Sequence, residues 1–247
     1  MVEICANSVQ SAIYAEKGGA DRIELCQNLN EGGTTPSYGT IRYCVQNLAI
    51  PVFVLIRPRS GDFCYSETEY DVMKQDVLTC KELGVAGVVT GFLHPDFSVD
   101  TGRTKEIVTL ASPMKVTFHR AFDLSRNWQT NLEAIISCGC HRILSSGCRQ
   151  TALEGSNILH EMQLLAHNRI TILAGSGITP QNVTELILKT GVSEIHASCK
   201  GKRGTQRNTE DMLMDNSNVE WIETEEKTVR ELVEKTRVCF YKCTASP

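Results

Sequence analysis

The feature of this sequence that most limits its fold is an alternation of short β-type runs with amphipathic helical stretches along the whole chain. This alternation is typical of parallel strands joined by helices. Eight runs have strand character: VEIC from Val2, RIEL from Arg22, VFVLI from Val52, AGVVT from Ala86, KVTFH from Lys115, RILSS from Arg142, ITIL from Ile170 and EIHAS from Glu194. Eight units in 247 residues, with no Pro/Gly/Ser-rich linker, predict a single-domain (β/α)8 TIM barrel over residues 1–247. An open doubly wound sheet is the alternative.

Helical periodicity is clear in five of the intervening stretches: 8–17, 68–83, 130–137, 158–166 and 180–189. Pro180 would begin the last of these, at a first-turn position that tolerates proline. Several stretches end at glycines that can adopt the left-handed cap conformation: Gly18-Gly19, Gly84, Gly139 and Gly191.

The regular pattern breaks between Lys200 and Thr224, where the chain is polar and charged with few apolar residues such as Met212, Leu213 and Met214. This stretch is long for a loop between a strand and a helix, so we expect an extended loop that acts as a lid, forms a subunit contact or is disordered. A final helix is expected from about 225 to 237, within a C-terminal segment that runs to 247.

The composition limits the classes of molecule that this protein is expected to bind. The formal charge of -4 gives no basic surface, which argues against nucleic acid or an anionic membrane as a partner, and no uncharged run is long enough to span a bilayer. A small molecule or an ion is the expected partner. The eleven cysteines are odd in number and scattered, with no signal peptide before them, so we expect reduced, mostly buried thiols in an intracellular protein. The first residues already have strand character, so a targeting segment upstream of this sequence is left open.

Three strand ends share one pattern, in which an acidic residue is followed two positions later by a residue that can bind a metal. The pairs are Glu3 with Cys5, Glu24 with Cys26, and Glu194 with His196. These strands are neighbours once the barrel closes, and a period of two places each acid and its ligand on the inward side. Cys5 and Cys26 would then be diagonal neighbours that could hold a soft ion, Cu(I) in preference to a closed zinc site. The alternative is that both cysteines are inert filling of the barrel.

A second group of residues has catalytic character. Arg57 follows the third strand, while His119, Arg120 and Asp123 follow the fifth. Histidine with acidic and arginine partners is typical of proton transfer on an anionic substrate. We expect Arg57 to compensate the inward Glu3 and Glu24. The alternative is an ion-pair network without catalytic function.

The turn after the seventh strand contains Gly175, Ser176 and Gly177 before a helix. Exposed backbone N–H groups beside a helix N-terminus can bind an anion, and phosphate-binding barrels use this position. A plain tight turn is the alternative. Cys138 and Cys140 lie at a turn from a helix to a strand, on the opposite face, and are expected to be structural.

At these strand ends the sequence closely resembles the CutC copper homeostasis family. The resemblance covers the chain from Met1 to about Ala197 and rests on these motifs in this order: VEICANS, RIELC, GGTTPS, IRPRSGDF, FHRAFD, ILSSG, AGSGI and EIHAS. It implies a barrel fold, copper handling with Cu(I) as the bound ion, and a homo-oligomer, either a dimer or a tetramer. It also implies a cytoplasmic location, with the nucleus as a further compartment.

Carried over by position, the cysteines of the family's EIC and ELC motifs are Cys5 and Cys26. The polar pocket of the family maps to Glu3, Glu24, Arg57, His119, Arg120, Asp123 and His196. The first hypothesis is therefore a Cu(I)-binding protein with His196 as a third ligand. The pocket holds more polar groups than one monovalent ion requires, so two alternatives stay open. One is an enzyme that acts on a small anionic or phosphorylated ligand, with His119 as acid/base and Arg57 and Arg120 as anion clamps. The other is a scaffold for a protein partner.

Overall fold

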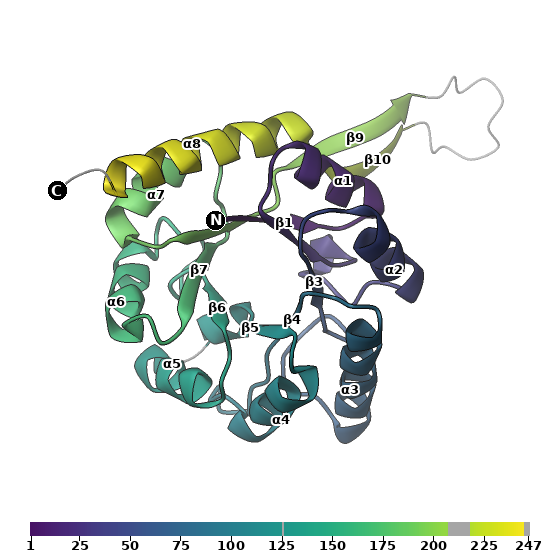
Figure 1. Ribbon diagram of the computed structural model, residues 1–247. Helices are drawn as coiled ribbons and strands as arrows, with labels where there is room; N and C mark the ends of the chain where they lie inside the picture. The colour runs from purple at the N-terminus through teal and green to yellow at the C-terminus, as the bar shows by residue number, and fades with distance from the viewer. Residues whose placement is uncertain (125, 207–217, 245–247) are drawn as a thin grey trace.

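The structure is a computed structural model that describes the chain except residues 125, 207–217 and 245–247. Eight parallel strands close into a barrel, and β1 pairs with both β2 and β8 (Figure 1). The barrel strands are β1 (Val2–Ala6), β2 (Arg22–Leu25), β3 (Val52–Leu55), β4 (Gly87–Thr90), β5 (Lys115–Phe118), β6 (Arg142–Ser145), β7 (Thr171–Gly175) and β8 (Glu194–Ala197). The predicted TIM barrel and the eight predicted strands are confirmed, and the open sheet is excluded.

Helices surround the barrel in Figure 1. They are α1 (Val9–Lys17), α2 (Tyr38–Asn47), α3 (Glu67–Glu82), α4 (Thr101–Ala111), α5 (Trp128–Ser137), α6 (Ser156–Ala166), α7 (Val183–Thr190) and α8 (Glu226–Thr244), with short 3-10 helices η1 (Leu29–Glu31) and η2 (Arg120–Leu124). Several begin at a residue whose side chain accepts a backbone N–H of the first turn, as Ser8 does from Ser11. The predicted start of the helix after β7 is wrong, because Pro180 lies in the preceding turn and α7 begins at Val183.

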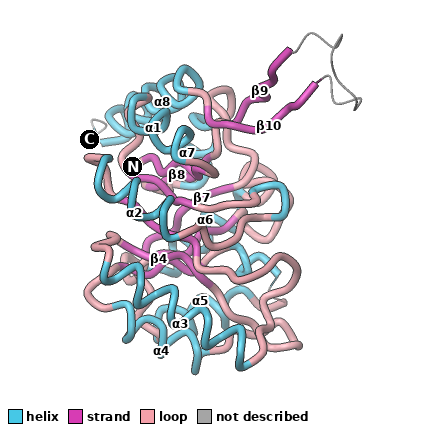
Figure 2. The backbone as a smooth tube through the Cα atoms, turned by 90° about the vertical axis from the view of Figure 1, so that its right-hand side faces the viewer, coloured by secondary structure: helices cyan, strands magenta, loops and turns pink. Residues whose placement is uncertain are grey.

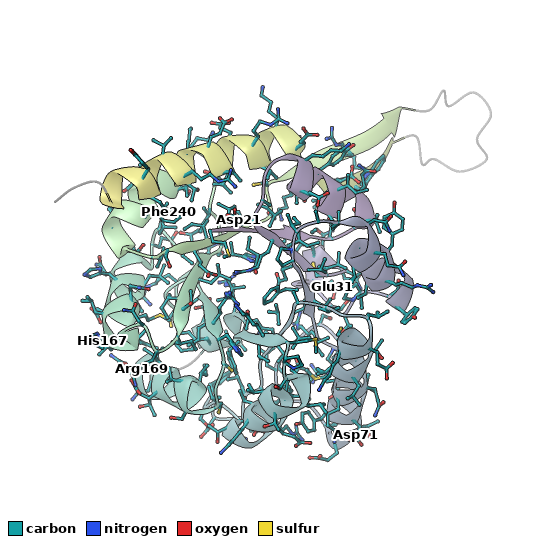
Figure 3. All side chains as sticks on the ribbon, viewed as in Figure 1. Asp21, Glu31, Asp71, His167, Arg169 and Phe240 are labelled. Atoms are coloured by element: carbon teal, nitrogen blue, oxygen red, sulfur yellow. The ribbon has the colours of Figure 1, made fainter. Side chains whose placement is uncertain are left out.

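The barrel strands follow the period-two pattern that their sequences predict. Outward residues such as Ile4, Ile23 and Val54 pack against the helices in one large apolar core. Inside the barrel, a small apolar cluster contains Cys5, Cys26, Phe53, Leu55 and Val89. The polar side chains of the site are therefore held in a barrel whose outer core fixes the strand positions. Figure 3 shows side chains filling the barrel interior.

The segment after β8 is more regular than its sequence indicates. Strand β9 (Lys200–Gln206) pairs in antiparallel fashion with β10 (Asn218–Thr224), and this hairpin extends away from the barrel (Figure 2). The description of 200–224 as an irregular loop is therefore wrong for these two strands, because backbone pairing does not need an apolar pattern. Met212, Leu213 and Met214 lie outside the described residues.

The C-terminal helix α8 runs to Thr244, further than predicted, and packs against α1 and α7. Most cysteines with described burial are buried, as expected; Cys64 and Cys148 are partly exposed. Among the residues that the structure describes, no helix combines the length and apolar character needed to cross a lipid bilayer.

Candidate functional site at the carboxyl ends of the strands

Two arginines, not Arg57, compensate the buried acids at the base of the site. Arg22 pairs with Glu3 through its Nε and with Glu194 through its Nη2, the latter at 2.6 Å. Arg142 Nε also contacts Glu194, at 2.9 Å. The expectation for Arg57 is wrong because Arg22 lies directly beside Glu3 in the register of β1 and β2. Arg22 lies two residues before Glu24 and therefore on the same inward face of β2. This spacing was the signal in the sequence that could have identified Arg22 as the partner of Glu3.

His196 lies above this ionic layer, between two carboxylates. Its Nδ1 is 2.7 Å from Glu3 Oε1, and its Nε2 is 3.5 Å from Glu24 Oε2. Burial alone would lower the pKa of His196, but the charge of Glu24 and the hydrogen bond to Glu3 outweigh burial and raise it. Burial likewise opposes ionisation of Glu3, yet the hydrogen bond with His196 and the charge of Arg22 lower the pKa of Glu3 to about 2. Both shifts favour an ion pair between Glu3 and His196.

Gly175 makes room for this histidine. A Cβ atom on Gly175 would lie 2.5 Å from Leu144 Cδ1 and 3.3 Å from His196 Cδ2. Such contacts are too close for any larger residue without movement of its neighbours. Gly175 itself does not line the cavity described below; its lack of a side chain leaves room for Leu144 and His196, and its predicted role in anion binding stays a prediction.

Cys5 and Cys26 are brought together, as their strand positions predict. Their Sγ atoms are 3.6 Å apart, and both side chains are buried. The hydrogen bond with Cys26, burial and the nearby charge of Glu24 raise the pKa of the Cys5 thiol well above its usual range. Burial, reinforced by the charge of Glu3 and partly offset by His196, raises the pKa of Glu24. In the metal-free protein, Cys5 is thus a protonated thiol.

A possible metal-ligand set lies at this point. Ligand atoms of Cys5, Glu24 and His196 all lie within 4.8 Å of one another. Cys26 adjoins the set through Cys5. One thiol pair, one imidazole and one carboxylate therefore converge where β8, β1 and β2 end.

The other side of the site is formed by Arg57 and His119, both of which are only 5% exposed. Arg57 donates to the carbonyl oxygens of Glu31, Gly33 and Gly61 at 3.1, 2.8 and 2.8 Å. The Phe63 ring packs against both groups, with its centroid 5.0 Å from the Arg57 guanidinium carbon and 4.7 Å from the His119 ring centroid. Burial, together with the charge of Arg57, lowers the pKa of His119 to about 3. His119 is therefore neutral.

Arg120 and Asp123 differ in their position relative to the cavity. Arg120 lines the cavity, and its side chain is 43% exposed. Asp123 does not line the cavity. Its carboxylate accepts from the Ser145 hydroxyl at 2.6 Å and from the backbone N–H groups of Ser146 and Cys148 at 3.0 and 3.2 Å. Asp123 therefore orders the loop after β6 and holds Arg120 in place, at 2.8 Å.

The turn after β7 contributes Ser176 and Gly177 to the cavity wall, and both have positive φ angles, 86° and 68°. The Ser176 hydroxyl donates to the carbonyl of Gln150, while Asn182 donates to the carbonyl of Gly177. These bonds hold a tight turn, and the predicted anion-binding role of the turn stays a prediction.

The cavity enclosed by these groups has a volume of about 690 Å³. Its polar lining groups are Cys5, Glu24, Cys26, Arg57, His119, Arg120, Ser176, Thr179, Gln181, His196, Ser198, Cys199, Lys200 and Thr228. A cavity of this size is typical of small-molecule sites and is larger than a single ion requires. The structure thus joins both predicted residue groups in one cavity, but on different walls. Glu3, Asp123 and Gly175 support the cavity from behind.

Comparisons with known proteins agree on one family. The family model described as "CutC family" matches residues 1–201. The chain is 48% identical over 202 residues to a protein from Chromobacterium violaceum whose name contains "family protein CutC", covering 82% of each chain. It is 43% identical over 203 residues to the human "Copper homeostasis protein cutC homolog", covering 82% of this chain and 74% of the human one.

Solved structures agree with the sequence comparisons. A crystal structure of the putative copper homeostasis protein CutC from Streptococcus agalactiae has a TM-score of 0.76 and 31% identity, over 80% of this chain and 98% of that one. An N-(5'-phosphoribosyl)anthranilate isomerase from Pyrococcus furiosus, with a TM-score of 0.56 and 16% identity over 96% of this chain and 98% of its own, shares the fold alone.

Proposed function

Because this chain belongs to the CutC family, we propose that it is a copper homeostasis protein that binds Cu(I) between Cys5 and Cys26. The observation that carries the proposal is the pair of buried sulfur atoms 3.6 Å apart in the wall of a cavity. Thiolates are soft ligands and favour Cu(I) or zinc over hard cations. In a reducing compartment such as the cytosol, the two thiols stay available for metal instead of forming a disulfide.

The distance between the sulfurs supports a third ligand. With metal–sulfur bonds of about 2.3 Å, two sulfurs this close hold an ion in a bent arrangement, which leaves one side of the ion open. His196 fits that side, because its Nδ1 is held by Glu3 and its Nε2 faces Glu24. A carboxylate that holds one nitrogen of a ligating histidine is a common arrangement behind metal sites. Glu3 would thus orient His196, and the Arg22 layer would hold Glu3.

The test is anaerobic Cu(I) titration against a competing chromogenic chelator. We expect about one Cu(I) per chain, because Cys5 and Cys26 are the pair of adjacent inward sulfurs among the residues that the structure describes. The Cys5→Ser/Cys26→Ser double variant should lose this copper. Cys138→Ser/Cys140→Ser is the matched control, since these buried thiols lie between α5 and β6, on the opposite face of the barrel. Copper retained by a folded Cys5→Ser/Cys26→Ser variant would exclude this site.

A second candidate function is acid/base catalysis on a small ligand in the same cavity. The observation that favours it is Glu24, a buried cavity residue whose pKa is raised by burial and by the charge of Glu3. A carboxyl group with a raised pKa holds its proton more readily than a free carboxyl group, so it can serve as a proton donor. His119 does not suit the role that its sequence context suggests, because a pKa of about 3 leaves it a weak base. Conversion of small carboxylates or phosphates by the wild type and not by Glu24→Gln would support this function.

A further inference from the structure

We propose that the cavity wall formed by Arg57 and His119 is a binding site for the anionic group of a small organic ligand, a carboxylate or a phosphate. This site is distinct from the sulfur site, because its residues come from the ends of β3 and β5 and not from β1, β2 and β8. Neither the copper proposal nor the catalytic role of Glu24 uses these two side chains.

His119 supplies a hydrogen-bond donor with no acceptor. Its Nδ1 accepts from the backbone N–H of Ala121 at 3.2 Å. Since the ring is neutral, the proton is on Nε2. Nε2 is buried and has no hydrogen-bond partner among the residues that the structure describes. A buried donor without an acceptor costs about 1–3 kcal/mol, so such groups usually face a ligand or another partner.

Arg57 supplies a buried positive charge that no carboxylate of the described residues pairs with. Three of its N–H groups are bound by backbone carbonyl oxygens, and Nε has no partner in the described part of the chain. Carbonyl dipoles hold the guanidinium in place but do not neutralise its charge. Within the described residues, Arg57 forms no ion pair, whereas Arg22 and Arg142 are both paired with buried acids. An anionic ligand would provide the missing charge.

Phe63 lies between Arg57 and His119 and contacts both of them, so the three side chains form one continuous part of the cavity wall. Its ring packs against both the guanidinium and the imidazole, and all three residues line the cavity. Because Arg57 and His119 are almost fully covered, we expect a ligand that reaches their nitrogens to move neighbouring side chains, and Phe63 packs against both groups. Phe63 is itself only partly buried and lies two residues after Gly61, which has a φ of +92°.

The chemistry of this wall indicates an anion and not a metal. A neutral Nε2–H and a guanidinium offer donors only, and a cation would be repelled by Arg57. Oxygen atoms of a carboxylate or a phosphate accept from both group types. Arg120 and Lys200, which also line the cavity, add positive charge toward the solvent side. The volume of about 690 Å³ leaves room for the rest of an organic molecule.

The test uses metal-free protein with ¹⁵N-labelled histidine and follows the His119 Nε2 signal by long-range ¹H–¹⁵N NMR. Inorganic phosphate and acetate are titrated separately at constant ionic strength, with sodium chloride as the reference. We expect a saturable shift of the His119 signal with at least one of the two anions. A response to phosphate alone would identify a phosphate-type ligand, and a response to acetate alone a carboxylate.

Variants assign the binding to this wall. His119→Phe, which removes the donor, and Arg57→Lys, which keeps the charge but loses the planar fork, should each weaken binding by about tenfold or more, measured by isothermal titration calorimetry. Arg42→Met, on the exposed side of α2, is the control for loss of a positive charge and should bind normally. Cys5→Ser/Cys26→Ser should lose copper but keep the anion. If neither anion shifts the His119 signal beyond the effect of sodium chloride, or if His119→Phe binds as tightly as the wild type, the proposal is wrong.

Discussion

The two sides of the cavity shift the pKa of a histidine in opposite directions. His196, between Glu3 and Glu24, has a raised pKa, whereas His119, beside Arg57, has a pKa lowered to about 3. Both histidines are mostly buried; His196 lies within β8 and His119 comes directly after β5. The β1–β2–β8 side is rich in carboxylates and thiols and suits a cation. The β3–β5 side has a positive charge and neutral donors and suits an anion. The neighbours of a buried histidine thus decide its charge, because burial alone would leave both neutral.

The largest expected effect concerns the ionic layer under the cation side. Arg22→Met removes the arginine that Glu3 and Glu194 share, and leaves Glu3 with His196 and Glu194 with Arg142. We expect a loss of about 3–5 kcal/mol in the free energy of unfolding, measured by urea denaturation. Arg42→Met, at an exposed position of α2, should change little. Equal stabilities for the two variants would show that the layer does not support this side of the barrel.

The next effect concerns the neutral histidine on the anion side. The folded-state pKa of His119 is about 3, below its ordinary value of 6.5, so the unfolded chain binds the proton more readily. His119 therefore lowers the stability of the fold as the pH falls from about 6.5 toward 3. Between pH 7 and pH 4 this contribution should be about 3 kcal/mol. It should be absent in His119→Phe, so the difference between wild type and variant isolates it.

Urea denaturation at a series of pH values measures this difference. His167→Asn is the matched control, since His167 is exposed at a helix end with a φ of 46°, a conformation that asparagine tolerates. A pH profile of His119→Phe that is parallel to the wild type would mean that folding does not lower the pKa of His119. The contrast between the two histidines would then fail.

The sequence was sufficient to predict those features of the two sides that depend on the order of the strands and on which face of a strand a residue occupies. Eight alternating units predicted the barrel, and the positions of Cys5 and Cys26 at the ends of adjacent strands predicted that their sulfurs would meet. These inferences succeed because a strand has only two faces and a closed barrel has a fixed order of neighbours.

The charge partners could not be predicted in the same way. Arg57 was expected to meet Glu3 and Glu24, but loop carbonyls at Glu31, Gly33 and Gly61 bind it, and their positions depend on loop conformations that no periodicity encodes. The neutral state of His119 depends on its burial and on the charge of Arg57. The β9–β10 hairpin was missed because β9 is polar throughout, so the alternation of Val219 and Trp221 in β10 had no apolar partner strand to indicate a hairpin.

A third prediction concerns the pH dependence of copper binding on the cation side. The Cys5 pKa is raised by Cys26, burial and Glu24, so the ion must displace a proton from this thiol. His196, whose pKa is also raised, must release a proton before Nε2 can bind metal. Affinity should therefore fall as the pH falls, by about tenfold per pH unit for each proton released. Competition titrations between pH 8 and 6 measure this slope.

Glu24→Gln sharpens the same prediction. The charge of Glu24 contributes to the raised pKa of both Cys5 and His196, so its removal should move the affinity curve to lower pH. Glu161→Gln, at an exposed position of α6, is the control. An affinity that does not change with pH in the wild type would show that copper binds without displacing protons, which is incompatible with ligation by Cys5.

The smallest expected effect comes from two glycines, each of which makes room for one of the histidines. A Cβ on Gly91 would lie 2.6 Å from His119 Nδ1, and a Cβ on Gly175 would lie 2.5 Å from Leu144 Cδ1 and 3.3 Å from His196 Cδ2. Neither residue has a positive φ, so alanine is compatible with the backbone and acts through contact with its neighbours. Each alanine should cost about 1–3 kcal/mol in stability. The two variants should differ in their functional effects. Gly175→Ala should weaken Cu(I) binding by a few-fold and leave the His119 NMR signal unchanged. Gly91→Ala should shift the His119 NMR signal and leave Cu(I) binding unchanged. If either variant alters both measurements equally, the two walls are coupled through the barrel and do not form independent sites.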